Sequence, residues 1–160
     1  MAEKLRIQRK DIYEIEVNDN GDIISFALGD IELPFRLSEA YEDIDRIQQN
    51  LKQKLLVIEK QQDSRIKGSP MTKNQKAACE AQKQAFKDMR KAMDKFLGEG
   101  GCQKIFGDVN YFEMYTDLFE ELTKKGEDGL SHLDRMKISN DSISERIQRK
   151  YSTHSGNQVI

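Results

Sequence analysis

The stretch GEGGCQKIFGD, residues 98–108, is the first place where residue types and spacing could support chemistry. It holds four of the ten glycines of this 160-residue chain, at Gly98, Gly100, Gly101 and Gly107. A phosphate-binding loop needs Lys and then Ser or Thr after its last glycine, because the ammonium and hydroxyl groups reach the phosphates and Mg²⁺. Asp108 and Val109 follow Gly107 instead, and Gln103 stands where a dinucleotide-binding motif needs a small residue. We therefore predict that these glycines form a structural turn between helices and bind no cofactor.

The remaining reactive side chains form no catalytic or metal-binding pattern. His132 and His154 are the only histidines, and neither spacing assembles a nucleophile, a base and an orienting acid. Cys79 and Cys102 lie far apart with no CxxC or Cys/His spacing, so neither a disulfide framework nor a zinc site is indicated. Acidic residues such as Glu42 are typical of a solvated helix face. We predict a protein without enzymatic activity or a bound metal.

The composition favours a helical protein with protein partners. Hydrophobic residues make up 37% and charged residues 34%, with two prolines and no tryptophan. The net charge is −2 with both signs interspersed, which argues against nucleic-acid binding and against attraction to an acidic membrane. The first residues, MAEKLRIQRKD, lack the apolar core of a signal peptide, and no apolar run is long enough to span a bilayer. We expect a cytoplasmic protein.

Alternation of apolar and polar residues predicts a β-hairpin near the N-terminus. Tyr13, Ile15 and Val17 would share one face with an answering set in residues 24–28. Asn20-Gly21 suits a tight two-residue turn, although the neighbouring polar residues leave room for a longer loop. Short strands at residues 5–7 and 31–33 would extend the sheet, with Pro34 holding the latter to an edge. The whole hairpin region is predicted to cover residues 4–36.

Helical periodicity then predicts four helices, at residues 38–60, 72–97, 110–125 and 130–151. Thr72 and Gln75 form a capping box at the start of the second, and Gly98 ends it. Together these elements make an α+β, mainly α-helical fold: a small antiparallel hairpin or short sheet followed by four or five helices. We expect one domain over residues 1–151 and a flexible tail over residues 152–160.

Five side chains on the two central helices are candidates for partner binding: Met89, Met93, Tyr111, Tyr115 and Phe119. Methionine adapts to irregular surfaces, and the apolar arc that begins at Asn110 is wider than a peripheral helix of a polar chain needs. Each of the five also suits a core position, because periodicity does not separate a buried face from a binding face. We treat partner binding and core packing as two open alternatives.

Three phrases of the sequence carry a likeness to a known family: RIQRKDIYEIEVNDNGDI, DIELPFRLSEAYEDI and MRKAMDKFLGEGGCQKIFGD. In these phrases the chain resembles the tail assembly chaperones of long-tailed phages and prophages of Gram-positive bacteria. The likeness covers about residues 4–125. Its most specific part is the block from Met89 to Asp108, where an amphipathic helix runs into the glycine-rich corner.

The resemblance implies a non-enzymatic role in the assembly of the virion tail. Such chaperones bind the long, aggregation-prone tape measure protein and help bring tail tube subunits to it, so the implied partners are these two proteins and other copies of the chain. The resemblance also implies that the protein acts in the host cytoplasm. A different reading of the same helical sequence is a small adaptor or regulatory module that docks one fixed partner outside tail assembly.

Overall fold

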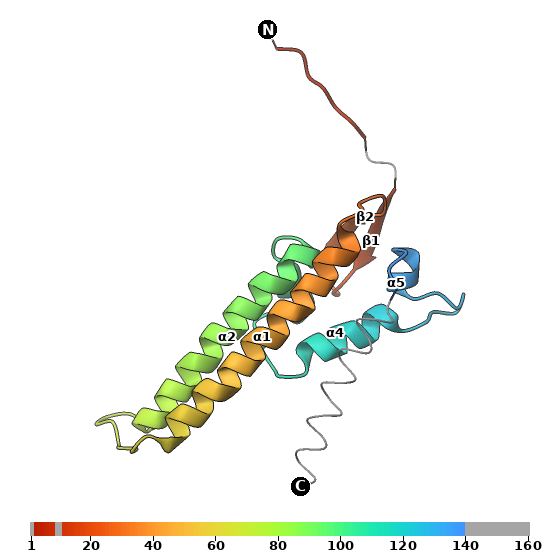
Figure 1. Cartoon of the computed structure of the whole chain (residues 1–160). Coiled ribbons are helices and arrows are strands. Elements are labelled where there is room, and N and C mark those ends of the chain that lie inside the picture. The colour runs from red at the N-terminus through yellow and green to blue at the C-terminus, as the bar shows by residue number, and fades with distance from the viewer. Residues whose placement is uncertain (1, 9–10, 140–160) are drawn as a thin grey trace. The chain divides into compact units, whose positions relative to one another are not determined.

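The structure, a computed structural model, describes residues 2–8 and 11–139 (Figure 1). Two strands and five helices follow one another within these residues, which confirms the α+β, mainly helical fold. The chain forms two compact units: one is Arg36–Cys102, and the other combines the chain up to Phe35 with the chain from Gln103 onward. The predicted tail at residues 152–160, and the predicted helix beyond residue 139, lie outside the described residues.

The hairpin consists of β1 (Ile12–Glu16) and β2 (Ile23–Ala27), which pair in antiparallel fashion. Tyr13 lies opposite Phe26, and Ile15 lies opposite Ile24, so the predicted apolar faces do answer each other. Ile24 and Phe26 are buried, whereas Ile23 and Ser25 are exposed and Ala27 is half-buried. The alternation in the sequence therefore sets which face of the hairpin packs on the rest of its unit.

The hairpin turn is the longer of the two turns that the sequence allows. The Val17 amide donates to the Asp22 carbonyl, so residues 18–21 connect the strands. The Asn18 side-chain oxygen accepts the backbone N–H groups of Asn20 and Asp22, at 2.9 and 3.2 Å. Gly21 has a φ of 82°, the left-handed conformation that glycine adopts at little cost.

The first helix, α1 (Leu33–Lys60), begins five residues before the predicted start and replaces the predicted edge strand at residues 31–33. Asp30 starts it: its carboxylate accepts the Glu32 amide at 3.0 Å, and its carbonyl accepts the Leu33 amide at 3.2 Å. Pro34 sits in the first turn, where its missing N–H has no helical partner to lose. Residues 5–7 also form no strand, and Leu5 and Ile7 are exposed.

Helix α2 (Lys73–Leu97) runs antiparallel beside α1 within the Arg36–Cys102 unit (Figure 1). At one end the Lys95 ammonium lies 3.9 Å from the Asp43 carboxylate, and at the other the Asn74 side chain donates to the Gln61 carbonyl at 2.8 Å. The predicted capping box of Thr72 and Gln75 is confirmed, with both of its hydrogen bonds present.

Burial along this helical hairpin falls toward its loop. On α1, Leu37, Ile44 and Leu51 are buried, whereas Leu55 and Ile58 are only half-buried. On α2 the buried positions begin at Ala85 and continue to Leu97: Ala85, Phe86, Met89, Ala92, Met93, Phe96 and Leu97. The apolar core of the hairpin therefore lies at the end remote from the loop.

The glycine-rich corner joins α2 to α3 (Gly101–Phe106). Gly98, Gly100 and Gly107 have positive φ values of 95°, 74° and 64°, whereas Gly101 is the first residue of α3 and is buried. A Cβ on Gly101 would lie 2.5 Å from the Leu97 Cβ, so only glycine fits there without a shift of the backbone. The Cys102 amide donates to the Asp94 carboxylate at 2.8 Å and ties the start of α3 to the last turn of α2.

The last two described helices are shorter than predicted. Helix α4 (Met114–Thr123) begins four residues after the predicted start, and Tyr111 and Phe112 precede it in a turn. Helix α5 (His132–Arg135) has a capping box from Ser131 and Asp134 but ends after four residues. Lys137 follows with a φ of 59°, which a continuing helix does not allow. None of the described helices combines the length and the apolar character needed to cross a membrane.

Candidate functional site

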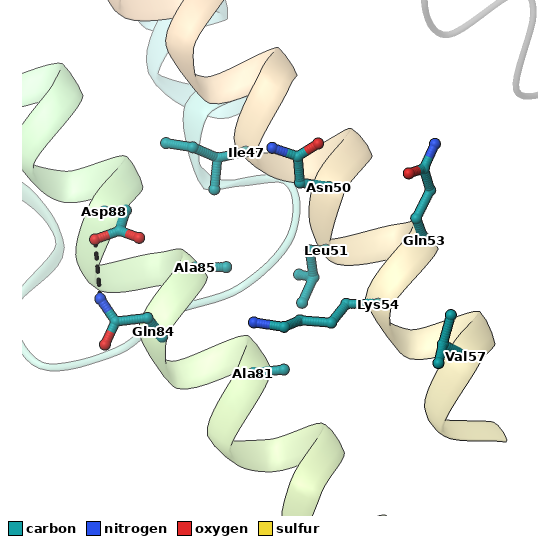
Figure 2. A pocket seen from close by; sticks show the side chains of 10 residues that line it. All are labelled: Ile47, Asn50, Leu51, Gln53, Lys54, Val57, Ala81, Gln84, Ala85 and Asp88. Atoms are coloured by element: carbon teal, nitrogen blue, oxygen red, sulfur yellow. Dashed lines mark hydrogen bonds between the residues drawn. The ribbon is translucent and has the colours of Figure 1, made fainter. Parts of the chain in front are cut away.

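A groove of about 420 Å³ lies between α1 and α2 on the loop-side half of the helical hairpin (Figure 2). Its residues on α1 are Ile47, Asn50, Leu51, Gln53, Lys54 and Val57, and those on α2 are Ala81, Gln84, Ala85 and Asp88. All ten belong to the Arg36–Cys102 unit. The groove is therefore a property of one unit and does not depend on the placement of the other.

Small side chains on α2 create the space of the groove. Ala81 and Ala85 are one helical turn apart and project toward α1, and Leu51 projects toward them from α1 (Figure 2). Because alanine has no atoms beyond Cβ, the interval between the two helices is left partly open at these levels. Leu51 and Ala85 are buried at the floor, while Val57 stays 58% exposed at the loop-side end.

The rim of the groove is polar and nearly neutral. Lys54 and Asp88 supply one charge of each sign, and Asn50, Gln53 and Gln84 supply uncharged donors and acceptors. The Gln84 side chain donates to the Asp88 carboxylate at 3.0 Å, one turn along the same helix (Figure 2). An apolar floor with adaptable amide groups on its rim suits the apolar stripe of a partner helix, with little selection by charge.

The five partner-binding residues predicted from the sequence lie in different environments. Met89 and Met93 are completely buried on α2, and Tyr115 and Phe119 are buried on α4. Tyr111 is 38% exposed in the turn before α4. Direct contact of the four buried side chains with a partner would require them to leave their present packing. Their binding role stays a prediction.

The structure brings Phe106, Tyr111 and Tyr115 together in the unit that includes the chain from Gln103 onward. The Phe106 ring meets Tyr111 and Tyr115 edge to face, with centroid distances of 6.3 and 5.8 Å. Such T-shaped pairs place the positive edge of one ring on the negative face of another and stabilise the contact. Tyr115 therefore packs within this aromatic cluster, whereas Tyr111 joins it from the surface.

The groove is a site that the sequence reasoning missed. Helical periodicity does not reveal it, because alanine counts as an apolar residue in the pattern whatever space its small side chain leaves. The sequence does contain a signal, which is the size of the apolar residues in the two halves of α2. The first half has the small Ala77, Ala78 and Ala81, whereas most apolar residues of the second half are larger. Among the described residues, no group of three or more His, Cys, Asp and Glu side chains is arranged to hold a metal ion.

Comparison with protein-family models, with curated proteins and with solved structures finds no match. The likeness to tail assembly chaperones therefore rests on the three sequence phrases alone. The geometry of the groove is an observation independent of those phrases.

Proposed function

We propose that this chain is a tail assembly chaperone of a long-tailed phage or prophage of Gram-positive bacteria. In this role it binds the tape measure protein in the host cytoplasm, keeps it soluble and helps bring tail tube subunits to it. The sequence resemblance supplies the identity of the client. The observation that carries the proposal is the apolar groove between α1 and α2, with its neutral polar rim.

The size of the groove suits reversible binding to a long helical client. A volume of about 420 Å³ accommodates a few apolar side chains and not a whole helix, so one copy covers a short stretch. Weak contacts of this kind release easily, while many copies along one client protect its whole length. Self-association of neighbouring copies would strengthen this coverage without new contacts to the client.

The neutral rim fits a chaperone better than a highly selective receptor. Specific recognition of one sequence relies on fixed charges or buried hydrogen bonds that penalise other partners. Here the rim offers mainly amide side chains, which can reorient to donate or accept. Successive stretches of a long client can therefore use the same groove, provided that each presents an apolar face.

A matched pair of substitutions on α1 tests the proposal. Val57 lines the groove, whereas its neighbour Leu56 is 48% exposed and does not. We expect Val57→Asp to weaken binding of the tape measure protein by about 2 kcal/mol, because it places a carboxylate against the apolar client. Leu56→Asp should leave binding nearly unchanged. Neither exposed change should alter the fold.

The readout is the amount of tape measure protein that stays soluble on co-expression with each variant. The client is the tape measure protein of the phage or prophage that encodes this chain, and circular dichroism checks that each variant is folded. Equal loss with both variants would contradict the role of the groove. Full-length tape measure protein that aggregates equally with and without the chain would reject the chaperone function and favour the adaptor alternative.

A further inference from the structure

The unit that combines the chain up to Phe35 with the chain from Gln103 onward contains a pocket that the proposed function does not use. It has a volume of about 340 Å³ and lies among the hairpin, the end of α3 and one side of α4. Its floor and walls are largely apolar, formed by Ile15, Val17, Ile24, Ile105, Phe106, Leu118 and Leu122. Tyr111 and His132 complete the lining.

Polar contacts between distant parts of the chain hold the walls of this pocket in place. The Asn18 side chain donates to the Lys104 carbonyl at 2.9 Å, and the Lys104 ammonium donates to the Ile23 carbonyl at 3.2 Å. The hydroxyl of Tyr13 is hydrogen-bonded to Nδ1 of His132, which joins β1 to α5. The pocket is thus bounded by elements that are cross-linked on two sides.

The charged groups that line the pocket are all acidic. Glu16, Asp117 and Glu121 contribute carboxylates, and neither Lys nor Arg is among the lining residues. The ammonium group of nearby Lys104 is turned to a backbone carbonyl of β2. The pKa of Tyr111 is raised, first by desolvation and then by its hydrogen bond to Asp117 and the charges of Asp117 and Glu113. The part of this shift in pKa that comes from the charges of Asp117 and Glu113 is what a negative potential at this edge of the pocket produces.

We propose that this pocket docks a segment of a partner protein in which an apolar side chain lies within one helical turn of Lys or Arg. The apolar side chain would fill the floor, and the cation would meet the carboxylates of Glu16, Asp117 and Glu121. The inference does not depend on the proposed function, because it rests on the shape and charge of this pocket alone. It gives the chain a second contact surface, selective for charge where the α1–α2 groove is not.

The chemistry of the lining decides against other ligands. Anionic ligands would be repelled by three carboxylates, and the space is too small for a folded domain to enter. An isolated apolar ligand would make no use of the three carboxylates. A free cation would leave the apolar floor of the pocket exposed to water. Only a ligand with both features, as on one face of a basic amphipathic helix, matches the whole surface.

Peptide binding to the full chain provides the test. The probe is a fluorescently labelled twelve-residue peptide of three leucine-alanine-lysine-arginine repeats, and the control peptide replaces each lysine and arginine with glutamate. At low ionic strength we expect the basic peptide to bind at least about tenfold more tightly than the acidic one. Raising the salt concentration from about 50 mM to about 500 mM should weaken that binding several-fold.

Helix α4 offers a matched pair of variants, because Glu121 lines the pocket and the adjacent exposed Glu120 does not. Glu121→Lys should weaken the basic peptide at least about fivefold, and Glu120→Lys less than about twofold. Both variants change the net charge equally, so the comparison removes the effect of overall charge. Equal effects of the two variants, or equal binding of the two peptides, would overturn the proposal.

Two other occupants give distinct results. Residues 143–151 of this chain, ISERIQRKY, have the same mixture of apolar and basic residues and lie outside the described residues. If Arg146→Glu with Arg149→Glu in the full chain tightens binding of the probe, this segment competes for the pocket, and the assignment to a partner protein is wrong. If the peptide dissociates a dimer in sedimentation experiments, the occupant is a second copy, which also overturns it. If the double variant binds the probe no more tightly than the wild-type chain does, and the chain is monomeric, the occupant is a partner protein.

Discussion

The hydroxyl of Tyr13 is hydrogen-bonded to Nδ1 of His132, a residue 119 positions further along the chain. Their ring centroids lie 5.9 Å apart, so the two side chains also share a packing contact. This contact joins the second residue of β1 to the first residue of α5. A four-residue helix has little stability of its own, so the contact contributes to holding α5 in place.

Removal of the Tyr13 hydroxyl should loosen α5. Tyr13→Phe keeps the ring but removes the hydrogen bond, and we expect a loss of about 1 kcal/mol in the free energy of unfolding. Hydrogen exchange at the buried Leu133 and Ile138 amides should become faster, while the amides of α2 stay protected. Tyr111→Phe, at a more exposed ring, is the control and should cost less. Equal rates of hydrogen exchange in the two variants would contradict a role of the Tyr13–His132 hydrogen bond in holding α5.

The same contact predicts a change at alkaline pH. Desolvation raises the pKa of Tyr13, the charge of Arg135 opposes that shift, and the charge of Asp128 adds to it. A raised pKa in the folded state means that the neutral phenol stabilises the fold below the unfolded value of about 10, and that this stability is lost as the pH rises through the folded pKa. Absorbance titration of the phenolate should show one tyrosine that ionises at a pH above the ordinary value, and this transition should be absent in Tyr13→Phe. Titration of all tyrosines at the ordinary value would exclude this.

Gly101 should not tolerate a methyl group. A Cβ there would lie 2.5 Å from the Leu97 Cβ, so Gly101→Ala must shift the backbone at the start of α3. We expect it to lower the free energy of unfolding by about 1–3 kcal/mol, as overpacking of a close contact does. Gly29→Ala is the matched control, because a Cβ on Gly29 meets no atom within 4 Å. Equal denaturation midpoints for the two variants would show that α3 can shift at no cost.

The loop between α1 and α2 should loosen in acid through Asp63. Hydrogen bonding from the Asn74 backbone is the main cause that lowers the pKa of Asp63, with further contributions from Thr72 and Ser64. A lowered pKa means that the carboxylate stabilises the loop above its unfolded value, and that this contribution is lost as the pH falls through the folded pKa. The amide proton shift of Asn74 should therefore titrate below about pH 3.9 in the wild-type chain and stay flat in Asp63→Asn. A transition at or above the ordinary value would contradict this account.

Truncation of the predicted partner residues separates core packing from binding. Met93 is fully buried and Tyr115 is 2% exposed, so Met93→Ala and Tyr115→Ala should each lower the free energy of unfolding by about 2–5 kcal/mol. Val57→Ala, at an exposed position of the groove, should cost far less stability. Chemical denaturation gives these values, and client binding is then compared per folded molecule. If Tyr115→Ala has nearly wild-type stability but binds the client more weakly, Tyr115 is an interface residue and not a core residue.

Local signals predicted much of the fold because they depend on neighbouring residues. The capping box of Thr72 and Gln75 follows from a spacing of three residues, and the shared face of Tyr13 and Ile15 follows from the two-residue alternation of a strand. The start of α1 was misplaced because residues 31–33 alternate like a strand, whereas Asp30 turns the chain and Pro34 fits a first helical turn. A β pattern three residues long carries too little information to exclude a helix start.

The candidate surfaces depended on information that periodicity does not contain. Met89 and Tyr115 fall on apolar stripes whether those stripes face the core or a partner, and only burial in the structure distinguishes the cases. The groove arises from Ala81 and Ala85 facing Leu51, and the acidic pocket needs β1, α3 and α4 side by side. These juxtapositions join residues far apart in sequence, so a single sequence could not show them.

The decline of burial along the α1–α2 hairpin has a thermodynamic consequence. Near the loop, Leu55, Ile58 and Ala81 are only half-buried, and the connection is completed by polar contacts such as Asn74 with Gln61. Separation of the helices there would expose little new apolar surface, so its heat-capacity change is small, whereas unfolding of the remote end carries the large positive change of a buried core. The loop-side half can therefore open as a local event over a wide range of temperature, and the groove can widen while the core of the hairpin stays folded.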